Sequence, residues 1–383
     1  MPRQLTGAVP SILPPATIGI IGGGQLGRMM ALSARQMGYR IAVLEPGKGS
    51  PLGQLADKEI DAAYDDDAAL RQLLTSSEVT TYEFENVSAR AIAELATVGN
   101  LPQGDQPIYL TQHRLREKDA INGAGFPTAP YADASTAELL TEAISQIGLP
   151  SILKTHTGGY DGKGQLVLRS ESDIPAAYEL VANAPAVLEG FVPFDLEISV
   201  IAHRSISGEV QVFGPFENVH RNSILHRSSF PAALPEAVAI AARELGTSLM
   251  QRLGFVGTLA IELFVVGTEL IVNELAPRPH NSGHLTIDGF NVSQFEQHIR
   301  AITGLPLVTP HPIAPSIMIN ILGQHLEYAL TQWQLPEFAW GKLHLYGKAE
   351  PKRDRKVGHI TFVHPDPVVL RQTVEAFLTD FPT

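Results

Sequence analysis

The sequence predicts a protein of mixed α/β and α+β class, with an open parallel sheet at its N-terminus and antiparallel hairpins after it. Three observations support this prediction. Apolar runs alternate with segments of helical spacing across residues 18–110. A glycine-rich segment, residues 154–165, lies between two strand-like runs, and two further apolar runs meet at Gly267 and Thr268.

Composition limits the classes of function. The 383 residues suffice for two or three domains, and 44% hydrophobic with 18% charged residues is typical of a soluble globular protein. The absence of cysteine excludes disulfides, thiolate nucleophiles and cysteine metal sites, and it fits a cytoplasmic location. A formal net charge of -12 argues against a nucleic-acid partner, because phosphate backbones demand clustered lysine and arginine.

The N-terminal segment is expected to be neither a membrane anchor nor a signal peptide. No apolar run reaches the roughly 20 residues of a membrane span. The first apolar stretch is broken by Pro10, Pro14 and Pro15. We therefore expect residues 1–17 to be a loose leader without an assigned function.

The first strand, TIGIIGG, runs into a glycine-rich turn. Gly22, Gly24 and Gly27 spell G-x-G-x-x-G, and Glu45 ends the next strand. Such a turn lets a phosphate approach the backbone, and the acid can bind a ribose hydroxyl, which indicates a dinucleotide site. The alternative is a tight strand-to-helix turn that binds another phosphate or nothing. Gln25 follows, where a helix N-terminus can meet an anion.

The segment KTHTGGYDGKGQ is expected to be a loop between two strands. LPSILK precedes it and QLVLRS follows, so no helix N-terminus is available and a P-loop is excluded. A hairpin loop can close as a flap over phosphates, with backbone N–H groups as donors and Lys154 and Lys163 as cations. A mobile surface hairpin is the alternative.

Acidic residues occupy unusual positions in the strands that follow. Glu189 ends one strand, Glu197 lies in an apolar run, and the hairpin LAIELFVV–ELIVNELA carries Glu262 and Glu274. A three-residue turn sets Glu262 opposite Glu274, and a two-residue turn sets it opposite Asn273. Facing carboxylates without histidine or cysteine suggest Mg²⁺ or Mn²⁺, although an accidental acidic pair is the alternative.

Four motifs in this order, GGGQLGRM, GGYDGKGQ, NELAPRPHNSGH and RKVGHI, resemble the N5-carboxyaminoimidazole ribonucleotide synthetases of purine biosynthesis, in the ATP-grasp superfamily. The resemblance runs from about Ile18 to the C-terminal region. Formate-dependent glycinamide ribonucleotide transformylase has a similar architecture, but its first turn and flap are less alike. The leader before Thr17 is longer than the family pattern.

The resemblance implies an ATP-grasp architecture of three domains. A Rossmann-like parallel sheet would span residues 18–110, and the ATP-grasp domain 111–305, with a flap subdomain at about 131–195. A small β-rich domain would span 306–383.

The resemblance also implies an ATP-dependent ligase that carboxylates 5-aminoimidazole ribonucleotide with bicarbonate through carboxyphosphate, giving ADP and phosphate. The residues implied to bind ATP are Arg114, Lys154, Gly159, Tyr160, Asp161, Gly162, Lys163, Gly164, Gln165, Glu189, Gly190, Phe191, Val192, Glu197, His220, Asn273 and Glu274. Glu189 to Val192 would meet the adenine edge and Glu197 the ribose. Glu262 and Glu274 would hold Mg²⁺, with Mn²⁺ as the alternative.

The first turn would then hold the nucleotide substrate rather than NAD. The residues implied to bind this substrate are Gly24, Gln25, Leu26, Glu83, Arg278, His280, Asn281, Lys348, Arg355 and Lys356. The basic loop that supplies the last three suits a ribose phosphate better than a solvated charge run or a nucleic-acid patch. Catalysis is assigned to Asp161, which would accept the proton of the substrate amine, and to Tyr160 and Lys348. The alternative for Asp161 is that it only shapes the turn.

Two rival functions are an oxidoreductase, which the first turn alone suggests, and a nucleotide sensor without catalysis. The resemblance further implies a homodimer and leaves open a downstream mutase partner. Carboxyphosphate itself or CO2 released from it would be the carboxylating species.

Overall fold

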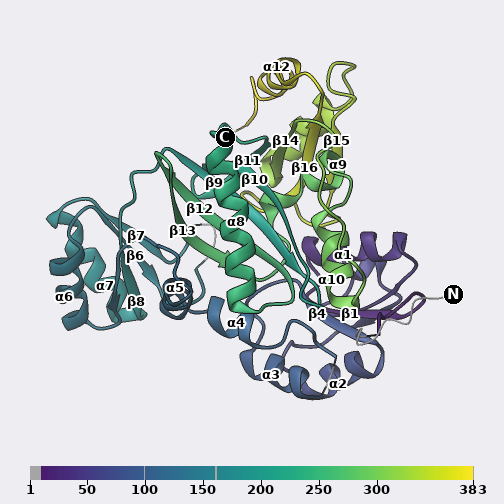
Figure 1. Ribbon diagram of the computed structural model, residues 1–383, viewed down its shortest axis with the longest axis horizontal. Helices are drawn as coiled ribbons and strands as arrows, with labels where there is room; N and C mark the ends of the chain where they lie inside the picture. Colours follow the sequence, from purple (N-terminus) through teal and green to yellow (C-terminus); the bar gives the residue numbers. More distant parts are fainter. Residues whose placement is uncertain (1–9, 99, 160–161, 383) are drawn as a thin grey trace.

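The structure is a computed structural model that describes residues 10–98, 100–159 and 162–382. It contains three sheets, and in Figure 1 the largest of them lies between the other two. Among the described residues, no helix is long and apolar enough to cross a membrane.

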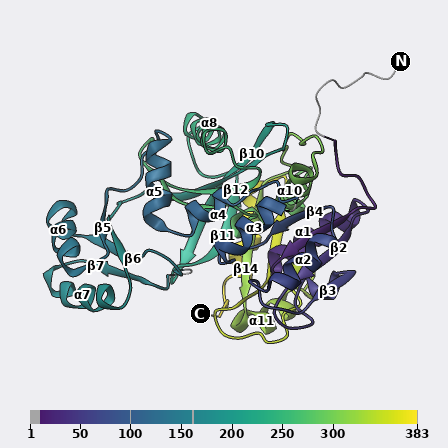
Figure 2. The ribbon, with the colours of Figure 1, turned by 90° about the horizontal axis from the view of Figure 1, so that it is seen from below.

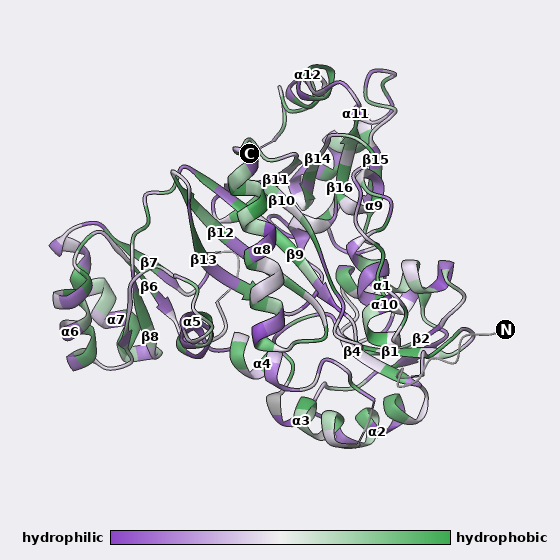
Figure 3. Cartoon of the chain, in the orientation of Figure 1, coloured by the Kyte–Doolittle hydropathy of each residue, from purple (hydrophilic) through white to green (hydrophobic). Residues whose placement is uncertain are grey.

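The N-terminal sheet is parallel, as predicted, with strand order β3-β2-β1-β4. Its strands are β1 (Thr17–Ile21), β2 (Arg40–Leu44), β3 (Lys58–Ile60) and β4 (Val79–Tyr82). The connecting helices are α1 (Gln25–Gln36), α2 (Asp67–Thr75) and α3 (Ala89–Val98). Strands β1, β2 and β4 are almost wholly buried because helices cover the sheet on its faces, and Figure 3 shows their hydrophobic character.

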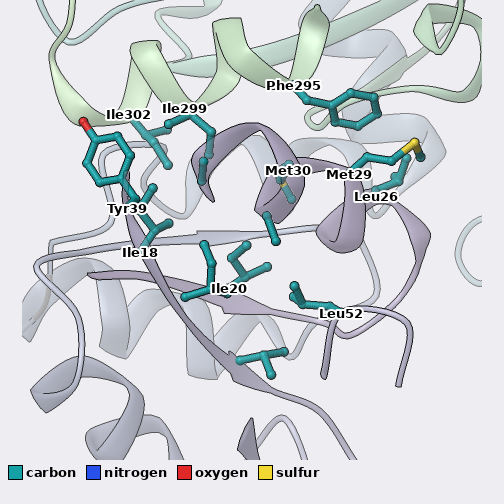
Figure 4. Packing of buried hydrophobic residues seen from close by; sticks show 14 of the residues in the cluster. Ile18, Ile20, Leu26, Met29, Met30, Tyr39, Leu52, Phe295, Ile299 and Ile302 are labelled. Atoms are coloured by element: carbon teal, nitrogen blue, oxygen red, sulfur yellow. The ribbon is translucent and has the colours of Figure 1, made fainter. Parts of the chain in front are cut away.

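Helix α10 (Gln294–Thr303) ties this sheet to the rest of the chain. Its residues Ile299 and Ile302 pack in one buried cluster with Ile18 and Ile20 of β1 and Met30 of α1 (Figure 4). A shared core of this kind fixes the parallel sheet against the segments that follow the carboxylate hairpin. The loops at the carboxyl ends of the parallel strands are thereby held in place.

The second sheet is antiparallel, with order β5-β8-β6-β7, and it carries the flap. Its strands are β5 (Tyr131–Ala134), β6 (Ser151–Thr155), β7 (Gln165–Leu168) and β8 (Ala186–Gly190), and its helices are α6 (Ala137–Ile147) and α7 (Ile174–Asn183). Lys154 pairs with Gln165, so the glycine-rich segment connects two antiparallel strands, as predicted. Figures 1 and 2 show this sheet and its helices at one end of the molecule.

The third sheet has eight antiparallel strands in the order β13-β12-β9-β10-β11-β14-β16-β15. They are β9 (Leu196–Arg204), β10 (Val210–Arg221), β11 (Ile224–Phe230), β12 (Gly257–Val266), β13 (Glu269–Ala276), β14 (Ser316–Leu322), β15 (Lys342–Leu345) and β16 (Lys356–Val363). The last three strands, from the C-terminal segment, therefore extend the sheet that contains the carboxylate hairpin. The basic loop lies between β15 and β16, as predicted.

Helices complete this part of the chain. They are α4 (Gln106–Thr111), α5 (Arg114–Gly123), α8 (Glu236–Leu253), α9 (Thr286–Gly289), α11 (Leu326–Gln332) and α12 (Pro367–Phe377). Helix α8 packs on β9 and β10 through a buried stripe that includes Val238, Leu245 and Leu249.

A β-bulge decides the register of the β12–β13 hairpin. Val266 pairs with Glu269, so the turn has two residues, Gly267 and Thr268. That turn alone would set Glu262 opposite Asn273. However, a β-bulge shifts the register by one residue between Leu263 and Glu262, and Glu262 therefore pairs with Glu274. The predicted facing carboxylates are therefore present, but a bulge and not a longer turn brings them together.

The expectation of a loose leader is wrong for residues 10–16, and Thr17 already begins β1. The backbone N–H of Ile12 donates to the carbonyl of Thr303 at 2.8 Å, and the Ser11 hydroxyl donates to the carbonyl of Gly304 at 2.8 Å. The Tyr39 hydroxyl donates to the Ile12 carbonyl. Prolines prevent this segment from forming a helix, but its backbone groups still find partners at the end of α10.

Candidate active site

A cleft of about 750 Å³ lies where the three sheets meet. It brings together eighteen of the residues predicted from the sequence: Gln25, Leu26, Glu83, Arg114, Lys154, Gly159, Gly162, Lys163, Gln165, Glu197, His220, Glu262, Asn273, Glu274, Arg278, His280, Asn281 and Lys356. They include residues of the first turn, the flap, the carboxylate hairpin with the loop after it, and the basic segment, together with Glu83, Arg114, Glu197 and His220. One site therefore collects all four motifs.

Several predicted residues do not line this cleft: Gly24, Gly164, Glu189, Gly190, Phe191, Val192, Lys348 and Arg355. Lys348 and Arg355 line a second cavity of about 970 Å³ beside it. Tyr160 and Asp161 lie outside the described residues.

Glu262 and Glu274 face each other across the hairpin inside the cleft. His280 Nε2 lies 3.3 Å from Glu262 Oε1, and Arg114 Nη1 lies 3.4 Å from Glu274 Oε2. Burial, and then the negative charge of Glu274, raises the pKa of Glu262 to about 7. A positive charge placed between the two carboxylates would therefore stabilise their charged forms.

This donor set suits a hard divalent cation. Two carboxylates supply oxygen ligands of the kind that Mg²⁺ prefers, and the described residues contain no group of three or more His, Cys, Asp and Glu side chains that could hold a metal alone. Magnesium bound by one or two carboxylates completes its octahedral shell with water and substrate phosphates. The two glutamates therefore fit a metal that arrives with a phosphorylated ligand.

The side chain of Glu189 forms two buried ion pairs. Its Oε2 lies 3.0 Å from Lys154 Nζ and 3.0 Å from Lys118 Nζ, and all three side chains are buried. Burial alone would raise the pKa of Glu189, but the two lysine charges hold it below its ordinary value. The carboxylate thus neutralises two cations at the edge of the cleft, and Lys118 is a site residue that the sequence did not reveal.

Glu117, the neighbour of Lys118 on α5, was also missed. It lines the cleft, and its Oε1 accepts the backbone N–H of Leu275 at 2.5 Å. Burial, and then the charge of Glu274, raises the pKa of Glu117 to about 8. Both residues look like part of a charged surface helix in the sequence, and their burial depends on how α5 packs against β13.

Glu197 and His220 form a pair on neighbouring strands, with His220 Nδ1 2.8 Å from Glu197 Oε2. Burial lowers the pKa of His220, but the hydrogen bond and charge of Glu197 outweigh it and raise the pKa above its ordinary value. Both side chains line the cleft. The pair offers a carboxylate and an imidazole to a ligand on the eight-stranded sheet.

The chain's own acids bind backbone N–H groups of the first turn, among them that of Gly24, which the resemblance assigns to the nucleotide substrate. The backbone N–H groups of Gly24 and Gly27 both donate to the Glu83 carboxylate, and that of Gly23 donates to Glu45 at 2.7 Å. Tyr64 donates a further hydrogen bond to Glu45. The amides of Gly23, Gly24 and Gly27 are therefore already bound by carboxylates, which would repel a dinucleotide phosphate, while Gln25 and Leu26 face the cleft.

Arg278 and Asn281 define the side of the cleft nearest the first turn. Arg278 Nη2 lies 2.5 Å from Glu85 Oε1, an acid that the sequence pattern did not single out. The side-chain oxygen and nitrogen of Asn281 are both buried and have no hydrogen-bond partner among the described residues. A buried amide without partners indicates that a polar ligand satisfies it.

Family models match three consecutive parts of the chain. Residues 15–107 match the ribonucleotide synthetase preATP-grasp domain, and residues 119–295 match the ATP-grasp domain. Residues 316–373 match the phosphoribosylaminoimidazole carboxylase C-terminal domain.

Individual proteins and solved structures are also similar to this chain over nearly its whole length. N5-carboxyaminoimidazole ribonucleotide synthase of Bacillus subtilis is 48% identical over 353 residues, which cover 92% of each chain. The structure of an N5-carboxyaminoimidazole ribonucleotide synthetase in its ADP complex has a TM-score of 0.93 at 50% identity, covering 96% of this chain and 97% of that one.

A third relative has both ligands bound. N5-carboxyaminoimidazole synthase from Aspergillus clavatus, in complex with ADP and 5-aminoimidazole ribonucleotide, has a TM-score of 0.88 at 30% identity, covering 95% of this chain and 98% of that one. The chain therefore belongs to the N5-carboxyaminoimidazole ribonucleotide synthase family of ATP-grasp ligases.

Proposed function

We propose that this protein carboxylates 5-aminoimidazole ribonucleotide with bicarbonate, at the expense of ATP, to give N5-carboxyaminoimidazole ribonucleotide, ADP and phosphate in purine biosynthesis. The observation that carries the proposal is the opposed pair Glu262 and Glu274, in a cleft that also holds the flap lysine Lys163 and the amide of Asn281, which has no hydrogen-bond partner among the described residues. The glutamate pair, through a bound metal, and Lys163 suit a nucleoside triphosphate. The amide of Asn281 suits a second polar substrate in the same cleft.

ATP is proposed to lie between the flap sheet and the eight-stranded sheet. Lys154 and Lys118, held together by Glu189, would bind its phosphates, and the flap glycines and Lys163 would close over them. The backbone of residues 189–192 would meet the adenine edge. Glu197 would bind the ribose hydroxyls, with His220 and Asn273 beside it.

Glu262 and Glu274 are proposed to hold Mg²⁺, or Mn²⁺ in its place. When bound, the metal neutralises phosphate oxygens that would otherwise be repelled by the two carboxylates. Arg114, 3.4 Å from Glu274, adds a positive charge on the same side. The metal and Arg114 together would offset the negative charge that develops as the terminal phosphoryl group is transferred.

The ribonucleotide substrate is proposed to lie on the opposite side of the cleft. Gln25, Leu26 and Glu83 would contact it from the first turn, and Arg278, His280 and Asn281 from the loop after β13. Its phosphate would lie toward Lys356, Arg355 and Lys348, since a monophosphate carries almost two negative charges.

The chemistry then takes two steps. Bicarbonate oxygen attacks the terminal phosphorus of ATP, which breaks its bond to ADP and gives carboxyphosphate. The exocyclic amine attacks the carboxyl carbon, directly or after CO2 is released, and inorganic phosphate and a proton leave. Asp161 is proposed to accept that proton while Tyr160 and Lys348 hold the carboxyl group. Tyr160 and Asp161 lie outside the described residues.

Two alternatives make different demands on the chain. An oxidoreductase needs a dinucleotide phosphate on the first turn, where Glu83 already occupies the amides. A sensor needs ATP binding without turnover. A homodimer, a cytoplasmic location and transfer of the product to a mutase remain proposals that follow from family resemblance.

One assay tests the proposed function. ADP release is measured while 5-aminoimidazole ribonucleotide and bicarbonate are omitted in turn, with the carboxylated product followed by incorporation of labelled bicarbonate. Release that requires both substrates and matches product formation supports the ligase. Binding of ATP without any release supports the sensor instead.

A further inference from the structure

His284, a histidine in the loop after β13, lines the active-site cleft, but no step of the proposed reaction uses it. Its side chain is buried and packs against the rings of Phe295, His359 and Tyr346, at centroid distances of 5.6, 5.0 and 6.2 Å. These contacts hold the plane of the imidazole. A ligand in the cleft therefore meets His284 in a fixed orientation.

One of the two imidazole nitrogens of His284 is already bound by Gln294, the first residue of α10. Gln294 Oε1 accepts the backbone N–H of His280 at 2.9 Å, and Gln294 Nε2 donates to the His280 carbonyl at 2.7 Å. These two bonds fix which end of the amide carries the hydrogens. The same Nε2 lies 3.2 Å from His284 Nδ1 and donates its second hydrogen there. His284 Nδ1 is therefore an acceptor without a hydrogen of its own.

The Gln294 amide cannot turn over without losing these bonds. The Gln294 side chain is fully buried, and its backbone N–H donates to the Thr286 hydroxyl at 2.9 Å. Gly283 makes room for it, because a Cβ at that position would meet Gln294 Oε1 at 2.6 Å. The loop after β13 is thus packed around one amide of fixed direction.

This contact decides the tautomer of His284. Burial, followed by the charges of His344, Lys356 and Arg278, lowers the pKa of His284 well below its ordinary value, so the ring is neutral at physiological pH. A neutral imidazole carries one hydrogen, which must lie on Nε2 because Nδ1 has none. Among the described residues, Nε2 has no hydrogen-bond partner. His284 therefore offers the cleft one N–H donor without a charge.

His284 lies between the two ends of the proposed ribonucleotide site. At one end, His280 Nε2 is 3.3 Å from Glu262 Oε1, where metal and phosphoryl group are proposed to meet. At the other end, the Tyr346 ring that contacts His284 also lies 5.9 Å from Lys348 Nζ. In 5-aminoimidazole ribonucleotide, the ribose joins the imidazole that carries the amine to the phosphate. The ribose is therefore the part of the substrate expected beside His284.

Asn281 supplies what a ribose hydroxyl requires besides a donor. It begins the 3₁₀ turn Asn281–Gly283, in which residues three apart lie on one face, as Asn281 and His284 do. Its amide oxygen and nitrogen are buried without a hydrogen-bond partner among the described residues. A hydroxyl both donates and accepts, so it satisfies Asn281 Oδ1 and His284 Nε2 together. The imidazole ring nitrogen and the phosphate oxygens only accept, and they would leave Asn281 Oδ1 unsatisfied.

We infer that His284, oriented by Gln294, donates a hydrogen bond from Nε2 to a ribose hydroxyl of the ribonucleotide, and that this contact selects ribose over deoxyribose. The inference rests on the proposed function, which places 5-aminoimidazole ribonucleotide in this part of the cleft. The 2′- and 3′-hydroxyls have the same chemistry, and analogues that lack one or the other distinguish them.

Kinetics with the intact enzyme test this selection. Carboxylation of the ribonucleotide and of its 2′-deoxy and 3′-deoxy analogues is measured at saturating ATP and bicarbonate. For wild type, kcat/KM should be about ten- to a hundredfold lower with the analogue that lacks the bound hydroxyl. In His284→Asn, whose side-chain oxygen can still accept from Gln294 but which has no donor in place of Nε2, this ratio should fall toward one. Equal ratios in wild type and His284→Asn would overturn the inference.

Two further variants separate the contact from a general loss of structure. His284→Gln, whose amide nitrogen reaches the position of Nε2, should recover part of the discrimination. His311→Asn replaces an exposed histidine that does not line the cleft, and it should match wild type. The KM for ATP should be the same in all of these proteins.

The tautomer is measured directly from the ¹⁵N resonances of the histidines in the unliganded wild type, where His284 is the signal missing from His284→Gln. We expect a hydrogen on Nε2 and none on Nδ1, and a shift of the Nε2 resonance when the ribonucleotide is added without ATP. A hydrogen on Nδ1, or no shift, would overturn the inference. If wild type forms no carboxylated product, the proposed function fails, while the Nε2 shift still decides whether His284 binds the ribonucleotide.

Discussion

The Glu83 carboxylate accepts a hydrogen bond from the backbone N–H of Gly27 at 2.6 Å, and it also accepts one from Gly24. It therefore occupies the place where a dinucleotide phosphate meets the glycines of this turn in other proteins. Burial raises the pKa of Glu83 to about 7, although both amides favour the charged form. The amides that this sequence motif predicts to bind phosphate thus bind a carboxylate of the same chain.

No nicotinamide dinucleotide is expected to bind. The pyrophosphate would have to displace Glu83 and would be repelled by Glu45 beside it. Titration calorimetry with NADH should show no heat of binding, whereas 5-aminoimidazole ribonucleotide under the same conditions should bind. Micromolar affinity for NADH would restore the oxidoreductase.

Glu262→Gln and Glu274→Gln should each lower the rate of ADP formation by about a hundredfold or more, since each removes charge where triphosphate and metal meet. The fold should persist, because glutamine fills the same volume. Glu269→Gln, at the exposed turn of the same hairpin, is the control and should retain full activity. Near-normal turnover by the Glu262 variant would contradict the assignment of this hairpin.

The contribution of Glu117 to the thermal stability of the unliganded protein should be lost as the pH rises from about 5 to 8, whereas buried histidines such as His203 and His298, whose pKa burial lowers to about 3, act in the opposite direction below about pH 6.5. Glu117 has a folded-state pKa of about 8 against an ordinary value of 4.5, so its contribution is fully present below pH 4.5 and is lost as the pH rises through 8. Glu262, with a pKa of about 7, acts in the same direction.

Glu117→Gln removes one of these titrating groups. The Tm of wild type should therefore decrease relative to that of Glu117→Gln over this range, in scans without nucleotide or metal. Glu269→Gln, which is exposed, should follow wild type. Identical slopes for wild type and Glu117→Gln would mean that Glu117 is charged in the folded protein throughout.

Glu189→Gln should destabilise the fold by about 3–5 kcal/mol, because it removes the carboxylate that pairs with both Lys118 and Lys154 while the two lysines stay buried. Urea unfolding gives the free energy, and Glu179→Gln on the exposed face of α7 serves as the control. Saturating MgATP should restore more stability to Glu189→Gln than to wild type, since its phosphates would replace the missing charge. Equal stabilisation of both proteins would argue against phosphate binding by these lysines.

Asp161→Asn should keep ATP binding and lose carboxylation by roughly a hundredfold or more, the usual scale for loss of a general base. Asparagine adopts the same turn conformations as aspartate, so the shape of the flap is preserved. Binding of ATP and incorporation of labelled bicarbonate are measured separately. Carboxylation at close to the wild-type rate would mean that Asp161 only shapes the turn.

Local signals in the sequence are enough to predict the parallel N-terminal sheet, the flap hairpin and the carboxylate hairpin. These signals are the period of apolar residues, the clustering of glycine, and two strands separated by a short turn. None of them requires knowledge of distant segments. For this reason Lys154, Glu262 and Glu274 are recognisable as site residues from the sequence.

Other features of the site depend on contacts between distant segments. The bulge that sets Glu262 opposite Glu274 depends on how β12 and β13 pair, and not on the length of their turn. Glu83 closes the first turn from a position 56 residues beyond Gly27 in the chain. Lys118 looks like an ordinary charged residue of a short helix, but α5 buries it against Glu189. Burial and long-range pairing fix the charge and orientation of a side chain, and neither is encoded in the spacing of its neighbours.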